Sequence, residues 1–268
     1  MNSSLAASAT VILATAEPAA KVALSRALAQ RWRDGGMAVG AATLPPRPAR
    51  PEYPALLPPR DMKRRRNFGS IGGRIALLHA LAHVELNAID LAWDLVARFA
   101  DPGLPRAFFD DWVAVAAEEA EHFALLGARL AALGGTYGDL PAHDGLWESA
   151  AATAHDLVAR LAVVPLVLEA RGLDVSPEMI RRLERAGDRD SAALLARIYD
   201  DEIGHVASGV RWFDFVCRTR GLDPEATFAE RVRRHFKGLV KPPFNIDARD
   251  RAGFPSTYYE PLAAPASQ

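Results

Sequence analysis

The sequence predicts an all-α fold, a four-helix bundle with a di-metal core, and three observations support this prediction. Glu-x-x-His occurs twice, as Glu119-Ala-Glu-His122 and as Glu202-Ile-Gly-His205. One Glu precedes each copy at almost the same distance, Glu85 by 34 residues and Glu169 by 33. Apolar residues recur around these positions at three- and four-residue steps, and we find no useful run with the two-residue period of a strand.

Four helices form the expected bundle, in two hairpins joined by a crossover. The first hairpin covers about 70–100 and 105–133, with Asp101-Pro102-Gly103 between its helices and Gly134-Gly135 at its end. The second covers about 145–171 and 190–220. Pro165, one turn before Glu169, predicts a kink. Ser176-Pro177-Glu178 is typical of an N-cap and first turn, which predicts a separate short helix ending at Ala186.

Appendages flank the bundle and divide the chain into three parts. Residues 1–69 hold an N-terminal helix that opens at Pro18 and ends at Gly35-Gly36, followed by an arm with seven prolines between 44 and 60. The bundle occupies 70–220. Residues 221–268 hold a helix over about 224–237 and an irregular aromatic tail, which we expect to pack on the bundle.

Composition limits the class of protein. The chain has 268 residues, 50% of them hydrophobic, and a formal net charge of −1. The only cysteine, Cys217, excludes an internal disulfide and suits a reducing cytoplasm. Leu5 to Ala16 is mildly apolar but lacks the basic start of a signal peptide. No apolar stretch approaches the roughly 20 residues of a membrane helix. We therefore expect a cytoplasmic protein without a membrane partner.

The repeated motif has the composition of a di-metal site. Glu and His three residues apart lie on one face of a helix. One Glu from each of two helices, with Glu-x-x-His from each of the other two, can hold two ions in a bundle. The predicted ligands are Glu85, Glu119, His122, Glu169, Glu202 and His205. Carboxylates with one imidazole per ion suit iron or manganese better than zinc or copper, and ligand type alone does not separate iron from manganese. The predicted cofactor is two iron ions, with manganese possible at one or both positions. One copy alone would suit a solvated helix face, but two copies within apolar helices favour a buried cation.

Three neighbouring residues are candidates for supporting roles. Glu118 and Asp201 each precede a ligand Glu, and an acid at that position can accept a hydrogen bond from a ligand His on another helix. We predict that Glu118 supports His205 and Asp201 supports His122; the alternative is that both face solvent. Tyr199, three residues before Glu202, is either a redox-active tyrosine or a core residue.

Several segments resemble known families. They are Pro58-Pro59-Arg60-Asp61-Met62, Gly73-Arg74-Ile75-Ala76-Leu77-Leu78-His79-Ala80, His83-Val84-Glu85-Leu86-Asn87-Ala88-Ile89-Asp90, Lys241-Pro242-Pro243-Phe244-Asn245 and Ala252-Gly253-Phe254. Over nearly its whole length the chain resembles the bacterial family called domain of unknown function 455. Residues 70–220 resemble the ferritin-like superfamily. More distantly, the chain is similar to the ferritin-like tRNA hydroxylase acting on a prenylated adenosine, which implies O₂ activation at the six ligands.

The leading functional hypothesis is a di-iron oxygenase, hydroxylase or oxidase that acts on an unidentified substrate with O₂, and an electron donor is compatible with it. A ferroxidase or peroxide-scavenging protein is the alternative, although the long appendages disfavour a storage cage. An RNA-modifying hydroxylase is a third reading, based on the basic residues Lys63, Arg64, Arg65, Arg66, Arg231, Arg233, Arg234, Lys237 and Lys241. A redox-inert structural bundle is the fourth.

Overall fold

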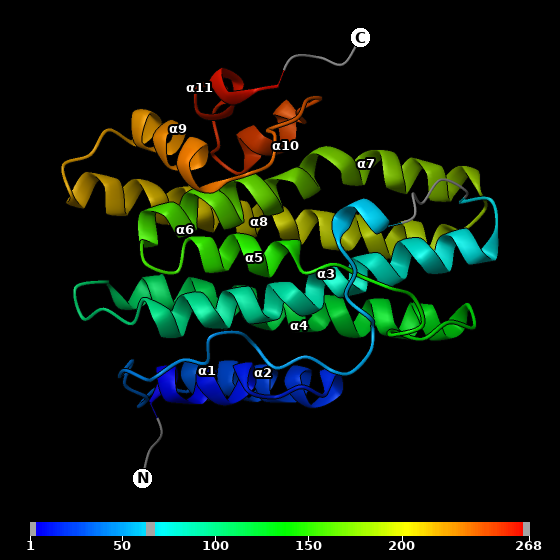
Figure 1. Cartoon of the computed structure of the whole chain (residues 1–268), viewed down its shortest axis with the longest axis horizontal. Coiled ribbons are helices and arrows are strands. Elements are labelled where there is room, and N and C mark those ends of the chain that lie inside the picture. Colours follow the sequence, from blue (N-terminus) through cyan, green and yellow to red (C-terminus); the bar gives the residue numbers. More distant parts are fainter. Residues whose placement is uncertain (1–3, 63–67, 265–268) are drawn as a thin grey trace. The chain divides into compact units, whose positions relative to one another are not determined.

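The described part of the chain, residues 4–62 and 68–264 of a computed structural model, is helical and contains no strand beyond two isolated bridges. This confirms the all-α prediction. The chain divides into two compact units, Met1–Trp147 and Glu148–Gln268. Figure 1 labels the helices of both. The basic residues Lys63 to Arg66 lie outside the described residues.

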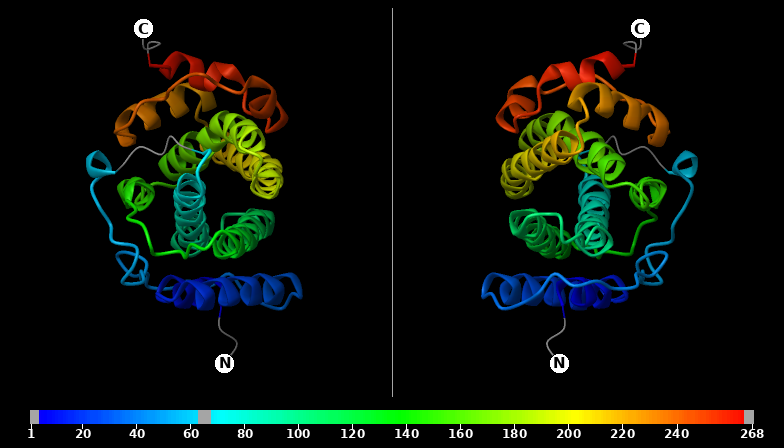
Figure 2. Two further views of the ribbon diagram at one scale, coloured as in Figure 1. Left: turned by 90° about the vertical axis from the view of Figure 1, so that its right-hand side faces the viewer. Right: turned by 90° about the vertical axis from the view of Figure 1, so that its left-hand side faces the viewer.

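Unit 1 is built on a pair of long helices, α3 (Ile71–Arg98) and α4 (Arg106–Ala132). The shorter helices α1 (Leu5–Leu13) and α2 (Pro18–Arg33) lie across one side of this pair, as the end-on views of Figure 2 show. Their core is apolar and aromatic, with Trp32, Trp93, Phe108, Phe109 and Trp112 at most 2% exposed.

The ends of these helices follow the expected local chemistry. Ser70 caps α3 by accepting a hydrogen bond from the Gly73 amide, and Pro18 opens α2 as predicted. Helix α1 was not predicted. Its start is capped by Ser4, and five of its nine residues are buried, so packing rather than amphipathic pattern stabilises it.

The proline-rich arm is extended, as predicted, apart from one turn of 3₁₀ helix at Pro59–Asp61. Backbone hydrogen bonds fasten it to unit 1. The Ala49 amide donates to the Leu13 carbonyl at 2.7 Å, and Leu57 and Ala55 bond with Ala142. The apolar side chains of Tyr53, Leu56 and Leu57 are partly exposed.

Unit 2 contains α6 (Leu157–Val163), a π-helix (Val164–Glu169), α7 (Ala170–Arg185) and α8 (Arg189–Thr219). Helix α5 (Gly145–Ala152) spans the boundary between the units. Helix α9 (Pro224–His235) packs on α6 and α8, and α10 (Ile246–Arg251) on α7 and α8. Helix α11 (Ser256–Tyr259) and a 3₁₀ turn (Glu260–Leu262) follow. The tail is therefore more helical than predicted.

Two predictions for unit 2 were wrong, namely a single helix over 145–171 and a separate helix that opens at Ser176. The single helix expected over 145–171 is interrupted, because the Asp156 side chain accepts a hydrogen bond from the Val158 amide and starts a new helix. The kink expected at Pro165 is a π-helical turn. The separate helix expected at Ser176 does not exist, since α7 continues through Pro177.

A residue of the tail explains how α7 accommodates proline. Pro177 cannot donate a hydrogen bond to the carbonyl of Leu173, one turn earlier. The side-chain amide of Asn245 donates to that carbonyl instead, at 3.0 Å. The tail thus satisfies the backbone group that would otherwise end the helix.

The expectation that no apolar stretch approaches the length of a membrane helix was wrong for α3, which is long and apolar enough to span a membrane by length and composition alone. However, 72% of its most apolar stretch is buried inside the structure. The helix is therefore largely a core helix of unit 1.

Candidate metal centre

In unit 1, α3 and α4 bring three predicted ligands together. The Nδ1 atom of His122 lies 3.5 Å from Oε2 of Glu119, on the same helix, and 3.8 Å from Oε2 of Glu85 on α3. Each of the three residues offers a ligand atom within 4.8 Å of the others. Glu119 and His122 are fully buried and Glu85 is 4% exposed. Three of the six predicted ligands therefore lie together within unit 1.

This group of side chains attracts positive charge. Burial disfavours a charged imidazole, but the carboxylates of Glu119 and Glu85 outweigh burial and raise the pKa of His122 to about 11. Two buried carboxylates beside one imidazole carry a negative charge that a cation stabilises better than a neutral neighbour does.

The donor set fits a metal ion. Ligand atoms bound at about 2.0–2.2 Å from an ion are at most about 4.4 Å apart. The distances from His122 Nδ1 to both carboxylates fall below that limit. Because Nδ1 is the ring nitrogen that faces the carboxylates, it is the atom expected to bind the ion. Oxygen and imidazole donors suit several divalent metals.

In unit 2, α8 repeats the local geometry of α4. The Nδ1 atom of His205 lies 3.6 Å from Oε1 of Glu202, one turn earlier, and both side chains are largely buried. Glu169 is half-buried and ends the π-helix. π-Helical turns are frequent at functional sites because they change the direction of the side chains that follow. Both Glu-x-x-His motifs therefore present Nδ1 beside a carboxylate.

Comparison with known proteins identifies the family. Residues 14–260 match the family described as "Protein of unknown function (DUF455)". The chain belongs to this family. An uncharacterized protein of Haemophilus influenzae is 44% identical over 213 residues, which cover 76% of this chain and 72% of that protein. No solved structure matches the chain. The resemblance to family 455 is confirmed.

The residues predicted to support the ligands have different surroundings in this DUF455 protein. Glu118 is exposed and Asp201 is half-buried. Their predicted hydrogen bonds to His205 and His122 stay predictions. The hydroxyl of Tyr199 accepts a hydrogen bond from Asn245 at 2.9 Å, so this side chain helps to fasten the tail within unit 2.

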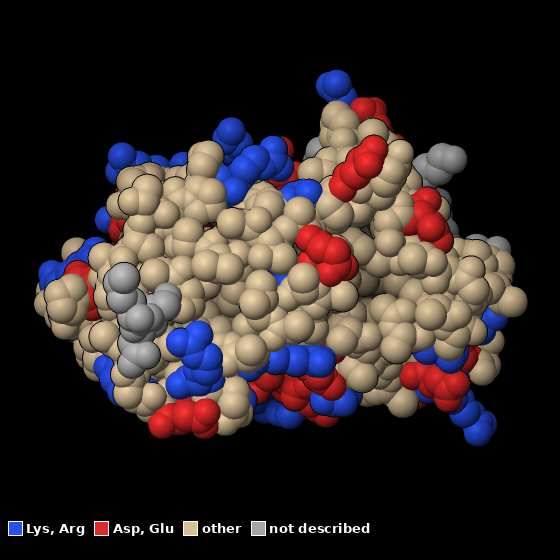
Figure 3. Space-filling view, turned by 90° about the horizontal axis from the view of Figure 1, so that it is seen from below, with Lys and Arg blue, Asp and Glu red and all other residues tan. Residues whose placement is uncertain are grey.

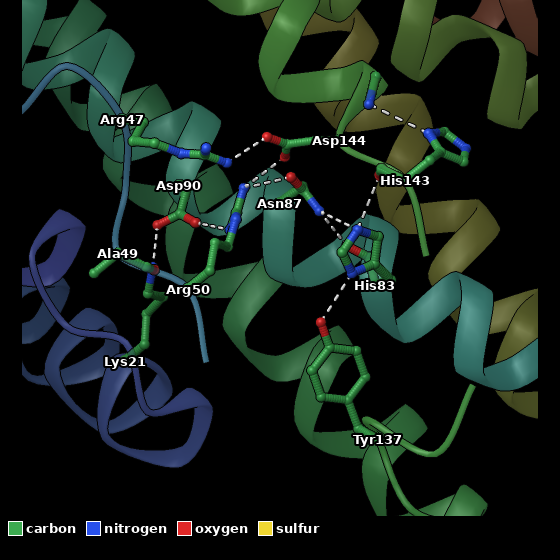
Figure 4. A network of polar contacts seen from close by, with 11 residues as sticks. Lys21, Arg47, Ala49, Arg50, His83, Asn87, Asp90, Tyr137, His143 and Asp144 are labelled. Carbon is green, nitrogen blue, oxygen red and sulfur yellow. Dashed lines mark hydrogen bonds and ion pairs between the residues drawn. The ribbon is translucent and has the colours of Figure 1, made fainter. Parts of the chain in front are cut away.

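A buried polar network on α3 was not predicted from the sequence of the DUF455 chain. Figure 4 shows Asp90 between Lys21 of α2 and Arg50 of the arm, with an ion pair to each. Asp90 is fully buried and Lys21 is 1% exposed. Burial lowers the pKa of Lys21 and raises that of Asp90, while their mutual attraction opposes both shifts. The network joins α2, α3 and the arm.

His83 continues this network along α3, on a different helix face from Glu85. Its Nδ1 lies 2.9 Å from the Tyr137 hydroxyl, and Nε2 lies 3.1 Å from the His143 carbonyl. Burial lowers the pKa of His83 to about 4, so the ring is neutral at physiological pH. These contacts give His83 a structural role in unit 1.

Two basic residues of α9 in the DUF455 chain, Arg231 and Arg234, lie beside acidic residues. Arg231 lies 3.1 Å from Asp156 and 2.8 Å from Glu230, and Arg234 lies 3.8 Å from Glu230. The face drawn in Figure 3 carries acidic side chains beside basic ones along its lower edge. The ion pairs of Arg231 and Arg234, which the view of Figure 3 does not draw, disfavour phosphate binding by α9.

Proposed function

We propose that this protein is a di-metal carboxylate oxidoreductase of ferritin-like architecture, with iron as its metal and O₂ as its oxidant. Its ligands would be Glu85, Glu119, His122, Glu169, Glu202 and His205, holding two ions in one centre. The observation that carries the proposal is the geometry of the two Glu-x-x-His motifs. In each, Nδ1 lies 3.5–3.6 Å from the carboxylate of the preceding turn.

The sequence supports a single metal centre made of all six predicted ligands. Each motif has one upstream Glu at an equivalent spacing, which is the ligand pattern of di-metal bundles. Glu85 lies 3.8 Å from His122 in unit 1, and by the repeat Glu169 would serve His205. Glu202 and Glu119 are then the equivalent ligands of the two helices α8 and α4.

The chain itself would place negative charge beside the metal ions and exclude water from them. Buried carboxylates next to Nδ1 bind cations without a competing solvent shell. The π-helix sets the position of Glu169. Bound iron supplies the electrons that O₂ needs for activation. Glu118, Asp201 and, less directly, Tyr199 are proposed to support the centre, and a separate electron donor is compatible with this function.

A ferroxidase or peroxide-scavenging function uses the same ligands and is the second candidate. The long segments outside the long helices disfavour iron storage. They include the arm, which is hydrogen-bonded to α1, and the tail, which is hydrogen-bonded to α7. An RNA substrate has weaker support, since Arg231 and Arg234 are ion-paired.

The test is metal content followed by reaction with O₂. The full chain is loaded anaerobically with Fe(II), freed of unbound iron, and measured for iron by mass spectrometry and for O₂ uptake with an electrode. We expect about two ions per chain and O₂ uptake that requires them. Many more ions per chain would support storage. Absence of tightly bound iron or manganese would contradict the proposal.

A further inference from the structure

Unit 2 contains a cavity of about 340 Å³ beneath its C-terminal segment, which we name the tail cavity. Its apolar lining includes Leu166 of the π-helix, Phe228 and Phe236 of the α9 region, and Val240 and Phe244 of the tail. The volume lies within the range of small-molecule sites, about 300–1,000 Å³. An apolar lining of this kind suits the body of an organic ligand.

Two buried hydrogen-bond donors line the tail cavity. Arg249 is 3% exposed and Tyr259 is 1% exposed. Nε and Nη2 of Arg249 donate to Asp174 at 2.9 and 2.8 Å. Within the described residues, Nη1 of Arg249 and the hydroxyl of Tyr259 have no hydrogen-bond partner. Buried donors normally have partners, because leaving one unpaired costs about 1–3 kcal/mol. A ligand with an acceptor group would remove this cost.

The guanidinium is held in a fixed position. Asp174 binds two of its nitrogens, and the ring of Tyr259 lies 4.2 Å from its central carbon. Burial raises the pKa of Tyr259, so its hydroxyl keeps the proton that it can donate. A rigid donor pair binds a ligand without loss of side-chain entropy.

Charge around the cavity favours an anion. Arg171, Lys241 and Arg249 line it with one acid, Asp174, which leaves a formal excess of positive charge. Inorganic phosphate would satisfy the donors but would leave the apolar walls in contact with a strongly hydrated ion. A carboxylate on an apolar body satisfies both parts of the lining.

We propose that the tail cavity binds a small organic acid with an apolar body, whose carboxylate accepts hydrogen bonds from Arg249 Nη1 and the Tyr259 hydroxyl. Leu166, Val167 and Leu168 line the cavity, and the next residue is Glu169. The bound acid therefore lies against the helix that carries a proposed metal ligand. The idea that the acid is a substrate of the metal centre rests on the proposed function. The idea that the cavity binds the acid is independent of the proposed function.

Calorimetric titration of the full chain with octanoate tests this inference, with 1-octanol and inorganic phosphate as comparison probes. Tyr259→Phe removes only the cavity hydroxyl. Its matched control is Tyr258→Phe, because the neighbouring Tyr258 hydroxyl donates to Asp214 at 2.6 Å and belongs to no part of the cavity lining. We expect octanoate to bind more tightly than either comparison probe. Tyr259→Phe should weaken octanoate binding about tenfold, whereas Tyr258→Phe should not.

Absence of octanoate binding would overturn the inference, as would equal affinities of the wild type and Tyr259→Phe. Binding of phosphate without octanoate would also overturn it. Metal content, measured on the same samples, separates the two proposals. Octanoate binding by metal-free protein supports the cavity even if the di-metal proposal fails, and normal iron content without octanoate binding rejects the cavity alone.

Discussion

Glu119 and His122 face each other across one turn of α4, with Oε2 of the glutamate 3.5 Å from Nδ1 of the histidine and both side chains fully buried. This spacing is the direct consequence of the helical period, since residues three apart share a face. The burial is not. It results from the packing of α4 on α3, which turns that face away from water. The first prediction follows from this pair.

Glu119→Gln should lower metal affinity by at least about 10- to 100-fold, because replacing even a hydrogen-bond partner of a ligand has an effect of that size. The substitution keeps the side-chain shape and removes the charge and a metal-binding oxygen. Bound iron or manganese after equilibrium dialysis is the measurement, and circular dichroism checks that the variant is folded.

The matched control is Glu121→Gln, two residues further along α4. The Glu121 side chain is 39% exposed and forms an ion pair with Arg26. The same chemical change at this site should leave metal content unchanged. Equal metal loss in both variants would mean that Glu119 is not a ligand.

Asp90→Asn should destabilise unit 1 strongly. The substitution leaves Lys21 buried without its anionic partner, and breaking a buried ion pair in this way costs about 3–5 kcal/mol. Urea unfolding followed by circular dichroism measures the loss. Glu121→Gln is again the control, since exposed ion pairs contribute about 0–1 kcal/mol. A similar small change in both variants would show that the Asp90 pairs add little net stability.

Much of the helix layout could be predicted because long helices have a strong periodic signal. The helices expected at 70–100 and 190–220 are observed as Ile71–Arg98 and Arg189–Thr219. Gly, Pro and capping residues mark their ends locally. The candidate ligands of unit 1 could also be found, because their residue types and spacing are visible in the sequence.

The unpredicted features depend on contacts between residues far apart in the chain. Pro177 appears to local rules as a helix start, and only the hydrogen bond from Asn245 to Leu173 shows why α7 continues. The ion pairs of Asp90 join residues from α2 and the arm. No spacing rule relates these positions. The tail cavity is likewise made by packing of the C-terminal segment.

Gly209→Ala should destabilise unit 2 by about 1–3 kcal/mol, the usual cost of overpacking. A Cβ at Gly209 would lie 2.6 Å from Cβ of Pro165 and 2.9 Å from its Cγ, at the start of the π-helix. The proline ring cannot rotate away, so the π-helix must move. Thermal unfolding measures the effect. Gly172→Ala on α7 is the control, because its Cβ would meet no atom within 4 Å and alanine favours helices. A neutral Gly209→Ala would contradict the tight packing of α8 on the π-helix.

Cys217 should make stability depend on pH in the alkaline range. Its side chain is buried on α8, and burial raises the pKa of the thiol from 9.0 to about 11. The folded state therefore keeps a proton that the unfolded chain releases. The resulting stabilisation is fully present below pH 9 and is lost as the pH rises toward 11, by at most about 1.4 kcal/mol per pH unit. Urea unfolding of the wild type and of Cys217→Ala at pH 8 and 10 isolates this contribution, because the other titrating groups are common to both proteins. The stability difference between them should shift in favour of Cys217→Ala at pH 10, and a difference independent of pH would show that the folded protein does not hold the thiol neutral.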